Sequence, residues 1–120
     1  MSSLEMYFYN RSGGAVTHTQ VQLDTDYAEL VPAVAGKKLV LLGFEIIPSA
    51  VDNLMDIAFN DEATDTTDTE LFIGMSVGSL IQPILVDLRE CPPVSATGEG
   101  VYGDISAGTA EASFYTMEIE

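Results

Sequence analysis

The sequence has very little of what disulfides, zinc sites and membrane helices require. Cys91 is the single cysteine and His18 the single histidine, so the chain can form no internal disulfide and neither a Cys₂His₂ nor a Cys₄ zinc site. No apolar run approaches the roughly 20 residues of a membrane-spanning helix. Residues 1–5 lack the basic and apolar parts of a signal peptide, so we expect a protein that is made in a cytoplasm and is not exported by the usual route.

Positive charge is also scarce, because 4 lysines and arginines stand against 19 aspartates and glutamates and leave a net charge of −15. Such a chain is repelled by DNA, RNA and anionic lipid, so we expect neither nucleic acid nor a membrane as a partner. Hydrophobic residues make up 47% of the 120 residues, which is the composition of one folded domain. The predicted domain spans residues 1–120, and residues 1–14 form a strand or arm that can pair with a neighbour.

Short segments rich in β-branched and aromatic residues alternate with turn clusters, which is typical of an all-β fold. Residues 27–31 fit either a short strand or one helical turn, and a break in the alternation between His18 and Val21 indicates a bulge. The predicted strands are 4–9, 15–23, 39–47, 54–59, 71–75, 80–88, 101–105 and 112–119. Eight or nine short strands favour an antiparallel β-sandwich with a jelly-roll-like topology.

Three of these segments carry more detailed expectations. Residues 39–47 are nearly all apolar and predict a central strand buried on both faces, with a bulge or a close backbone approach at Gly43. Pro83 cannot donate a hydrogen bond to a neighbouring strand, so residues 80–88 are predicted to form an edge strand or to carry a bulge at Pro83. Apolar and other residues alternate along the predicted strand 54–59. This alternation turns one set of apolar side chains toward the core, namely Met55, Ile57 and Phe59.

Two arrangements resemble catalytic motifs. Residues 74–78 match G-x-S-x-G with Ser76 at the centre, but the hydrolase nucleophile needs a following helix and a histidine later in the chain. His18 lies upstream of Ser76, so we interpret residues 74–78 as a glycine-rich hairpin turn. Cys91 and His18 have no local support as a nucleophile–base pair, and Cys91 fits a small apolar plug. The sequence predicts no enzyme, no catalytic residue and no cofactor.

Carboxylates are concentrated in the loop of residues 60–68. Carboxylate and carbonyl oxygens are the ligands that Ca²⁺ prefers, so the loop supplies candidate ligands for a metal, namely Asp61, Glu62, Asp65 and Asp68. The EF-hand pattern fails because no glycine occupies its sharp turn. Charge runs mostly remain solvated, and we therefore favour a solvated loop over a Ca²⁺ site.

Two groups of residues are candidates for protein interfaces. Tyr7, Phe8 and Tyr9 form an aromatic strand near the N-terminus, and such strands often pair with a sheet edge, their own or a neighbour's. Lys37 and Lys38 hold half of the positive charge directly before the most apolar strand. They fit either a charged strand end or an anchor for an acidic patch on a neighbouring subunit.

The segment A-G-K-K-L-V-L-L-G-F at residues 35–44 resembles a pattern of small tailed-phage β-sandwich virion proteins. In these proteins an A-G-K-K/R turn opens an apolar strand. Further strands and a glycine-rich turn follow, here as I-A-F-N at 57–60, F-I-G at 72–74 and A-G-T at 107–109. The resemblance covers residues 35–119. Both the acidic loop and the closing residues 112–120 depart from the pattern.

This resemblance implies a capsid decoration (cement) protein, or a related head-fibre or tail-associated module. Such a protein is a structural virion component without catalysis that binds the outer capsid surface and stabilises the shell. The implied partners are the major capsid protein and two further copies of the chain in a homotrimer. The implied location is the capsid exterior, after synthesis in the host cytoplasm. The alternative is a carbohydrate- or receptor-binding β-sandwich module, with or without dependence on Ca²⁺, on a phage fibre or tail.

Overall fold

A computed structural model describes residues 16–49, 53–64, 69–76 and 83–120, and these form eight β-strands. The strands are β1 Thr17–Leu23, β2 Ala28–Val31, β3 Lys38–Pro48, β4 Asn53–Asn60, β5 Thr69–Ser76, β6 Ile84–Asp87, β7 Gly100–Ile105 and β8 Ala110–Ile119. The described part of the chain contains no helix. The prediction of an all-β fold is therefore confirmed.

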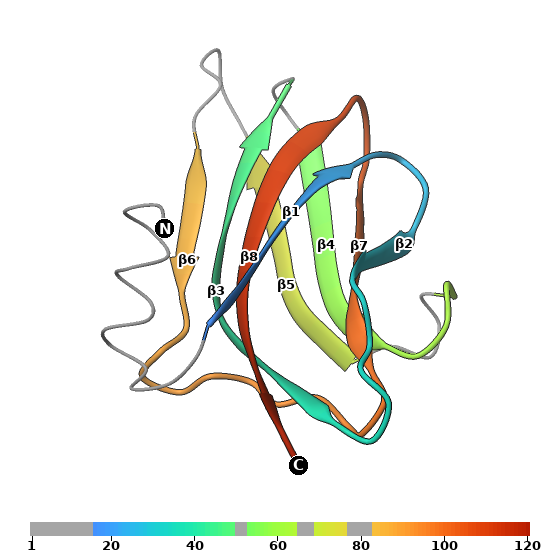
Figure 1. The fold of residues 1–120 in the computed structure, drawn as a ribbon. Helices are drawn as coiled ribbons and strands as arrows, with labels where there is room; N and C mark the ends of the chain where they lie inside the picture. The colour runs from blue at the N-terminus through green and yellow to red at the C-terminus, as the bar shows by residue number, and fades with distance from the viewer. Residues whose placement is uncertain (1–15, 50–52, 65–68, 77–82) are drawn as a thin grey trace.

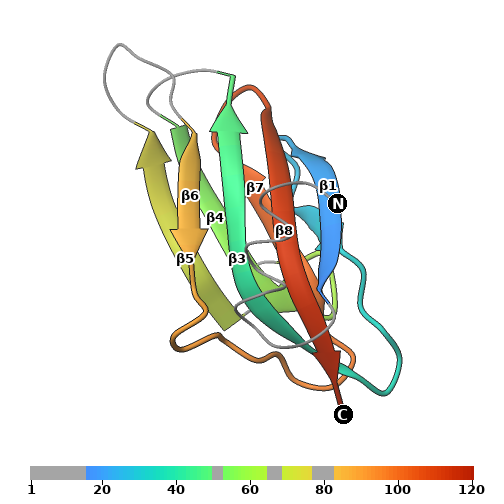
Figure 2. The ribbon, with the colours of Figure 1, turned by 60° about the vertical axis from the view of Figure 1, so that its left-hand side comes forward.

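The strands form two antiparallel sheets that lie face to face (Figure 1). The order in the first sheet is β1-β8-β3-β6, and the order in the second is β2-β7-β4-β5. Turned by 60°, the molecule shows β1 and β5 at opposite sides (Figure 2). Neighbours in each sheet are mostly far apart in sequence, so the pairing is dominated by long-range contacts.

One hydrophobic core fills the space between the two sheets. The first sheet contributes Phe44 and Phe114, whose ring centroids lie 5.6 Å apart. The second sheet contributes the three alternate residues of β4, which are all buried as predicted: Met55, Ile57 and Phe59. Period-2 alternation with one apolar face is what a half-buried strand requires. The local pattern therefore fixes which face of β4 meets the other sheet.

Strand β3 lies inside its sheet, between β8 and β6. Side chains on both of its faces are buried, as expected from its apolar run. Its register against β8 shifts between Leu41 and Gly43, which confirms the predicted bulge. Strand β6 begins directly after Pro83 and forms one edge of the sheet, which is the position that a proline tolerates.

Other expectations needed correction or lie outside the described residues. The bulge predicted between His18 and Val21 is wrong, because β1 pairs with β8 in one unbroken register from Thr17 to Leu23. The two polar residues at positions 19 and 20 interrupt the apolar alternation of the sequence, but they do not shift the backbone pairing of β1 with β8. The ambiguous segment 27–31 is a strand, β2. The predicted strand 4–9 lies outside the described residues.

Strand β6 pairs with only part of one edge of β3, and the loop that follows β6 forms hydrogen bonds with the rest of that edge. Leu88 N donates to Leu42 O at 2.9 Å, and Leu41 N donates to the carbonyl of Pro93 at 3.0 Å. Ser95 closes the row with two hydrogen bonds to Leu39. An uncovered strand edge presents free donors and acceptors to other chains, so this loop removes one site of edge-to-edge pairing.

Candidate functional site

The residues of the G-x-S-x-G motif do not meet the histidine. Ser76 ends β5, at one edge of the second sheet, and His18 lies on β1, at the opposite side of the molecule (Figure 2). The His18 ring stacks on Tyr115, with 4.8 Å between ring centroids and 5° between the ring planes. His18 is therefore not placed to take a proton from Ser76.

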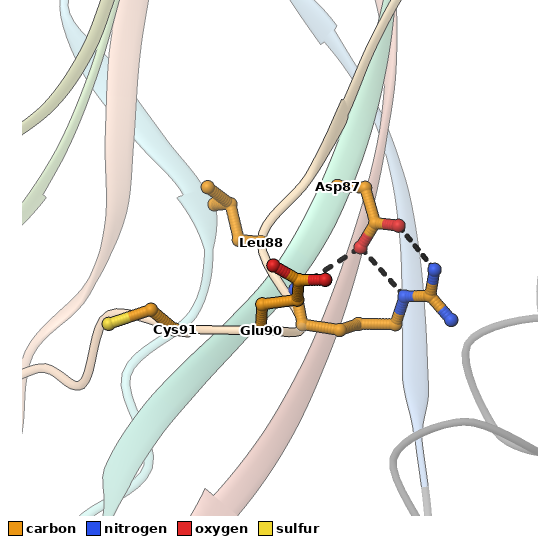
Figure 3. A pocket seen from close by; sticks show the side chains of 5 residues that line it. Asp87, Leu88, Glu90 and Cys91 are labelled. Carbon is orange, nitrogen blue, oxygen red and sulfur yellow. Dashed lines mark hydrogen bonds and ion pairs between the residues drawn. The ribbon is translucent and has the colours of Figure 1, made fainter.

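Cys91 lies in an open pocket of about 480 Å³ (Figure 3), at the side of the first sheet away from β1. The pocket is lined by Asp87, Leu88, Arg89, Glu90 and Cys91. The cysteine is exposed, so the prediction of a small apolar plug is wrong. Its loop runs across the surface from the end of β6, and its backbone amide donates to Leu88 O at 3.2 Å.

The guanidinium in this pocket is held by a neighbouring carboxylate. Arg89 Nε donates to Asp87 Oδ1 at 2.7 Å, and Arg89 Nη2 forms an ion pair with Asp87 Oδ2. The two-pronged contact matches the planar fork of an arginine to a carboxylate. The positive charge is thereby compensated inside the chain, and the pocket is not built to hold an anion.

The described start of the acidic loop, residues 60–64, is organised by Asn60, a buried residue at the end of β4. Its Oδ1 accepts hydrogen bonds from the backbone N–H groups of Asp61 and Glu62, at 2.8 and 3.3 Å. Its Nδ2 donates to Thr64 O at 2.8 Å and to the Tyr27 hydroxyl at 3.2 Å. An asparagine that bonds to the following backbone amides fixes a turn locally.

The candidate metal ligands are only partly described. Asp61 and Glu62 are exposed at the start of the loop, and Asp65 and Asp68 lie outside the described residues. Within residues 16–49, 53–64, 69–76 and 83–120, no three histidine, cysteine or carboxylate side chains converge in a way that could hold a metal ion.

Beside this loop lies a cluster that the sequence did not reveal. The rings of Tyr27 and Tyr102 stack with 5.7 Å between centroids. The Tyr102 hydroxyl donates to Glu29 Oε2 at 3.2 Å. Burial raises the pKa of the Tyr102 phenol, and the nearby Glu29 carboxylate raises it further. The more distant carboxylates of Asp61 and Glu62 raise the Tyr102 pKa in the same direction.

The outer face of the second sheet is strongly acidic. Asp56 on β4 lies directly opposite Asp104 on β7. Both point away from the core because their strand neighbours, such as Ile57 and Ile105, point into it. Asp56 Oδ1 is buried and has no hydrogen-bond partner in the described part of the chain. Like charges directly opposite on paired strands destabilise a sheet, so this face carries negative charge at a cost in stability.

The interface candidates are placed as follows. Lys37 precedes β3 and forms an ion pair with Glu120 at 2.7 Å within the same chain. Lys38 opens β3 and lies opposite Ile119 of β8. Tyr7, Phe8 and Tyr9 lie outside the described residues.

Comparisons with known proteins give no relative for this chain. No protein-family model, no curated protein and no solved structure matches it. In the part of the chain that the structure describes, no helix is long and apolar enough to span a membrane.

Proposed function

We propose that this chain is a structural virion component, a tailed-phage capsid decoration (cement) protein that binds the outer capsid surface and stabilises the shell. The strand pairing carries the proposal. The first strand pairs with the last, β2 with β7, β3 with β6, and β4 with β5. Winding one long hairpin around a barrel produces this nested order, and from it we infer a jelly-roll topology. Jelly rolls are typical of viral capsid and lectin domains, and the step from fold to role is an analogy.

The charge distribution supports a protein that is exposed on a particle. The net charge is −15, and the outer face of the second sheet presents Asp56, Asp104 and Glu29. Negative charge on an outer face repels other particles of the same kind and free nucleic acid. The basic residues that the structure describes lie elsewhere, at the start of β3 and after β6. In the proposed role, the acidic face points away from the shell.

The proposal includes a homotrimer bound to the major capsid protein on the capsid exterior, after synthesis in the host cytoplasm. The segment resembling phage virion proteins, residues 35–44, includes Lys37 and Lys38. Since Glu120 already compensates Lys37, Lys38 is the better candidate for an acidic patch on a neighbouring subunit. A positive charge at an interface rim sets register and association rate more than affinity.

Binding to shells tests this proposal. The purified chain is mixed with expanded shells assembled from the major capsid protein of the same genome, and the shells are sedimented. We expect saturable co-sedimentation, weakened by Lys38→Glu and unchanged by Glu111→Gln, a conservative change at an exposed residue of β8. Absence of the chain from the pellet at saturating concentration would refute the proposed role.

A second candidate function is a carbohydrate- or receptor-binding module. The observation that favours it is the half-buried ring of Tyr27, which lies near Asp61 and Glu62, the exposed carboxylates at the start of the acidic loop. Aromatic rings flanked by amide and carboxylate groups are suited to sugar hydroxyls. Glycan-array binding that needs calcium, together with a monomeric mass of 12.9 kDa by light scattering, would favour this function over the trimeric decoration protein.

A further inference from the structure

The exposed apolar side chains of the described residues are unevenly distributed over the two sheets. Five large apolar side chains are exposed in this part of the chain. One of them, Leu54, lies on β4 of the second sheet. The other four belong to the first sheet or to the loop that pairs with it, namely Ile47 on β3, Leu85 on β6, Val94 after β6 and Ile119 on β8. Exposed apolar side chains that gather on one face mark interaction sites, whereas scattered single ones are normal.

Ile47 and Leu85 lie near one end of the outer face of the first sheet. Their sequence neighbours Ile46 and Ile84 pack in or against the core, so alternation turns both side chains outward. Ile47 is 42% and Leu85 53% exposed. Glu45 lies directly opposite Leu85 on the paired strands and therefore points to the same side. We call Glu45, Ile47 and Leu85 the Glu45 patch.

Val94 and Ile119 lie near the opposite end of the same face. Leu39 of β3 belongs to the core, so alternation turns its neighbours Lys38 and Val40 outward. Ile119 lies opposite Lys38, and Val94 lies opposite Val40. Residues that lie opposite each other on paired strands share one side of the sheet. We call Lys38, Val94 and Ile119 the Lys38 patch.

The charged residue of each patch has no ion-pair partner within the described part of the chain. Glu45 forms neither an ion pair nor a side-chain hydrogen bond there, whereas Asp87 on the same face is already paired with Arg89. Lys38 likewise forms no ion pair there, whereas the adjacent Lys37 is paired within the chain. The face therefore presents one uncompensated negative charge at one end and one uncompensated positive charge at the other.

The two patches do not meet within one copy of the chain. Lys38 and Glu45 both lie on β3, which runs along the sheet from one end to the other (Figure 1). At about 3.3 Å per residue, their separation along the strand is roughly 23 Å, which is far longer than an ion pair. Because each copy carries a net charge of −15, acidic surfaces of two copies repel each other. A basic patch that meets an acidic one is therefore the favoured contact between copies.

We propose that a second copy of this chain docks on the outer face of the first sheet, with the Lys38 patch of one copy packed on the Glu45 patch of the next. The exposed apolar side chains of the two patches then bury each other, and the pairing of Lys38 with Glu45 fixes the register. A contact between unlike patches is heterologous and joins copies head to tail into a ring. The homotrimer is such a ring, and the number of three copies rests on the proposed function, whereas the contact itself does not.

Exchange of the two charges tests this contact. Lys38→Glu or Glu45→Lys alone places like charges opposite each other. We expect each to raise the concentration at which the assembly dissociates at least about tenfold, as measured by light scattering on a dilution series. The double variant places opposite charges there again, and we expect it to recover the wild-type mass, close to three times 12.9 kDa. Asp26→Lys makes the same change of charge as Glu45→Lys at an exposed residue between β1 and β2, and it should leave the assembly intact.

Two outcomes of the charge exchange would overturn the proposal. One is a wild-type chain that stays monomeric at high concentration. The other is a double variant that associates no better than the single variants. These samples contain no capsid shells, so a failure of this contact and a failure of shell binding are observed separately.

A matched pair of apolar substitutions gives a second readout. Leu85→Ser removes an exposed side chain from the Glu45 patch, whereas Leu54→Ser removes a similarly exposed one from the second sheet. We expect Leu85→Ser to weaken self-association several-fold and Leu54→Ser to leave it unchanged, with the β-sheet circular dichroism retained in both. Equal self-association of the two variants would contradict docking on the first sheet.

Discussion

Two serines make the same pair of hydrogen bonds to a leucine backbone but differ in burial, and the Ser95 hydroxyl also donates to Ala96 O at 2.8 Å. Ser95 Oγ accepts from Leu39 N at 2.9 Å, and Ser95 N donates to Leu39 O at 2.9 Å. Ser106 Oγ accepts from Leu54 N at 2.8 Å, and Ser106 N donates to Leu54 O at 2.9 Å. Ser95 is 4% exposed, whereas Ser106 is exposed. Replacing each by alanine removes the same side-chain acceptor from a backbone N–H group.

The expected losses differ because water can replace only one of the two acceptors. In Ser95→Ala the Leu39 N–H stays buried without a partner, which costs about 2 kcal/mol of unfolding free energy. In Ser106→Ala water bonds to the Leu54 N–H, and the expected cost is about 0.5 kcal/mol or less. With an unfolding entropy of about 2.1 cal/mol/K per residue, a 120-residue chain loses about 8 °C of Tm in the first variant and about 2 °C in the second.

Urea unfolding followed by far-ultraviolet circular dichroism measures both variants. The chain contains no tryptophan, so tyrosine fluorescence serves as the second probe. An unchanged m-value shows that the difference lies in stability and not in the extent of unfolding. Equal losses for the two variants would refute the reasoning, because burial would then not decide the cost of a lost acceptor.

Three further predictions concern a pair of glycines, a tyrosine and an ion pair. In Gly103→Ala the new Cβ would lie 2.4 Å from a backbone carbonyl oxygen of β4, so the strands must separate, and we expect a loss of about 3 kcal/mol in urea unfolding. Gly98→Ala meets no atom within 4 Å but has a φ of +82°, and its expected loss is only about 1 kcal/mol. Because burial raises the pKa of Tyr102 above 10.0, the native state keeps this proton longer than the unfolded chain. The stability that depends on the protonated phenol of Tyr102 is therefore complete below pH 10. It is lost as the pH rises through the pKa that Tyr102 has in the folded state. Tyr102→Phe should reduce this alkaline loss of Tm and remove from the absorbance titration one phenol that titrates above the ordinary tyrosine range. Lys37→Met breaks an ion pair whose partner, Glu120, is 86% exposed, and we expect a change of less than about 1 kcal/mol that shrinks further in high salt.

Features of the fold that depend on neighbouring residues could be predicted from the sequence. The inward face of β4 follows from its own alternation, and the bulge at Gly43 follows from a glycine inside an apolar strand. The start of β6 follows from Pro83, which lies directly before Ile84 and cannot donate a hydrogen bond to a neighbouring strand. In each of these cases the physical cause lies within a few positions along the chain.

Features that depend on pairing between distant segments could not be predicted. The hydrogen bond between Tyr102 and Glu29 exists because β2 lies beside β7, and nothing local indicates that neighbourhood. The exposure of Cys91 likewise depends on where the loop after β6 runs. Asn60 is different, because its hydrogen bonds to the next two backbone amides are local. The asparagine before the acidic run was a signal that could have predicted the loop's structure.

The most direct test of the proposed role is the heat stability of the shell itself. Expanded shells of the major capsid protein from the same genome are heated in a calorimeter with and without a saturating excess of this chain. Ligands that bind only the assembled state raise its transition temperature, so we predict a shell transition that moves upward with added chain and then reaches a plateau. An unchanged transition temperature at saturating excess would contradict the account.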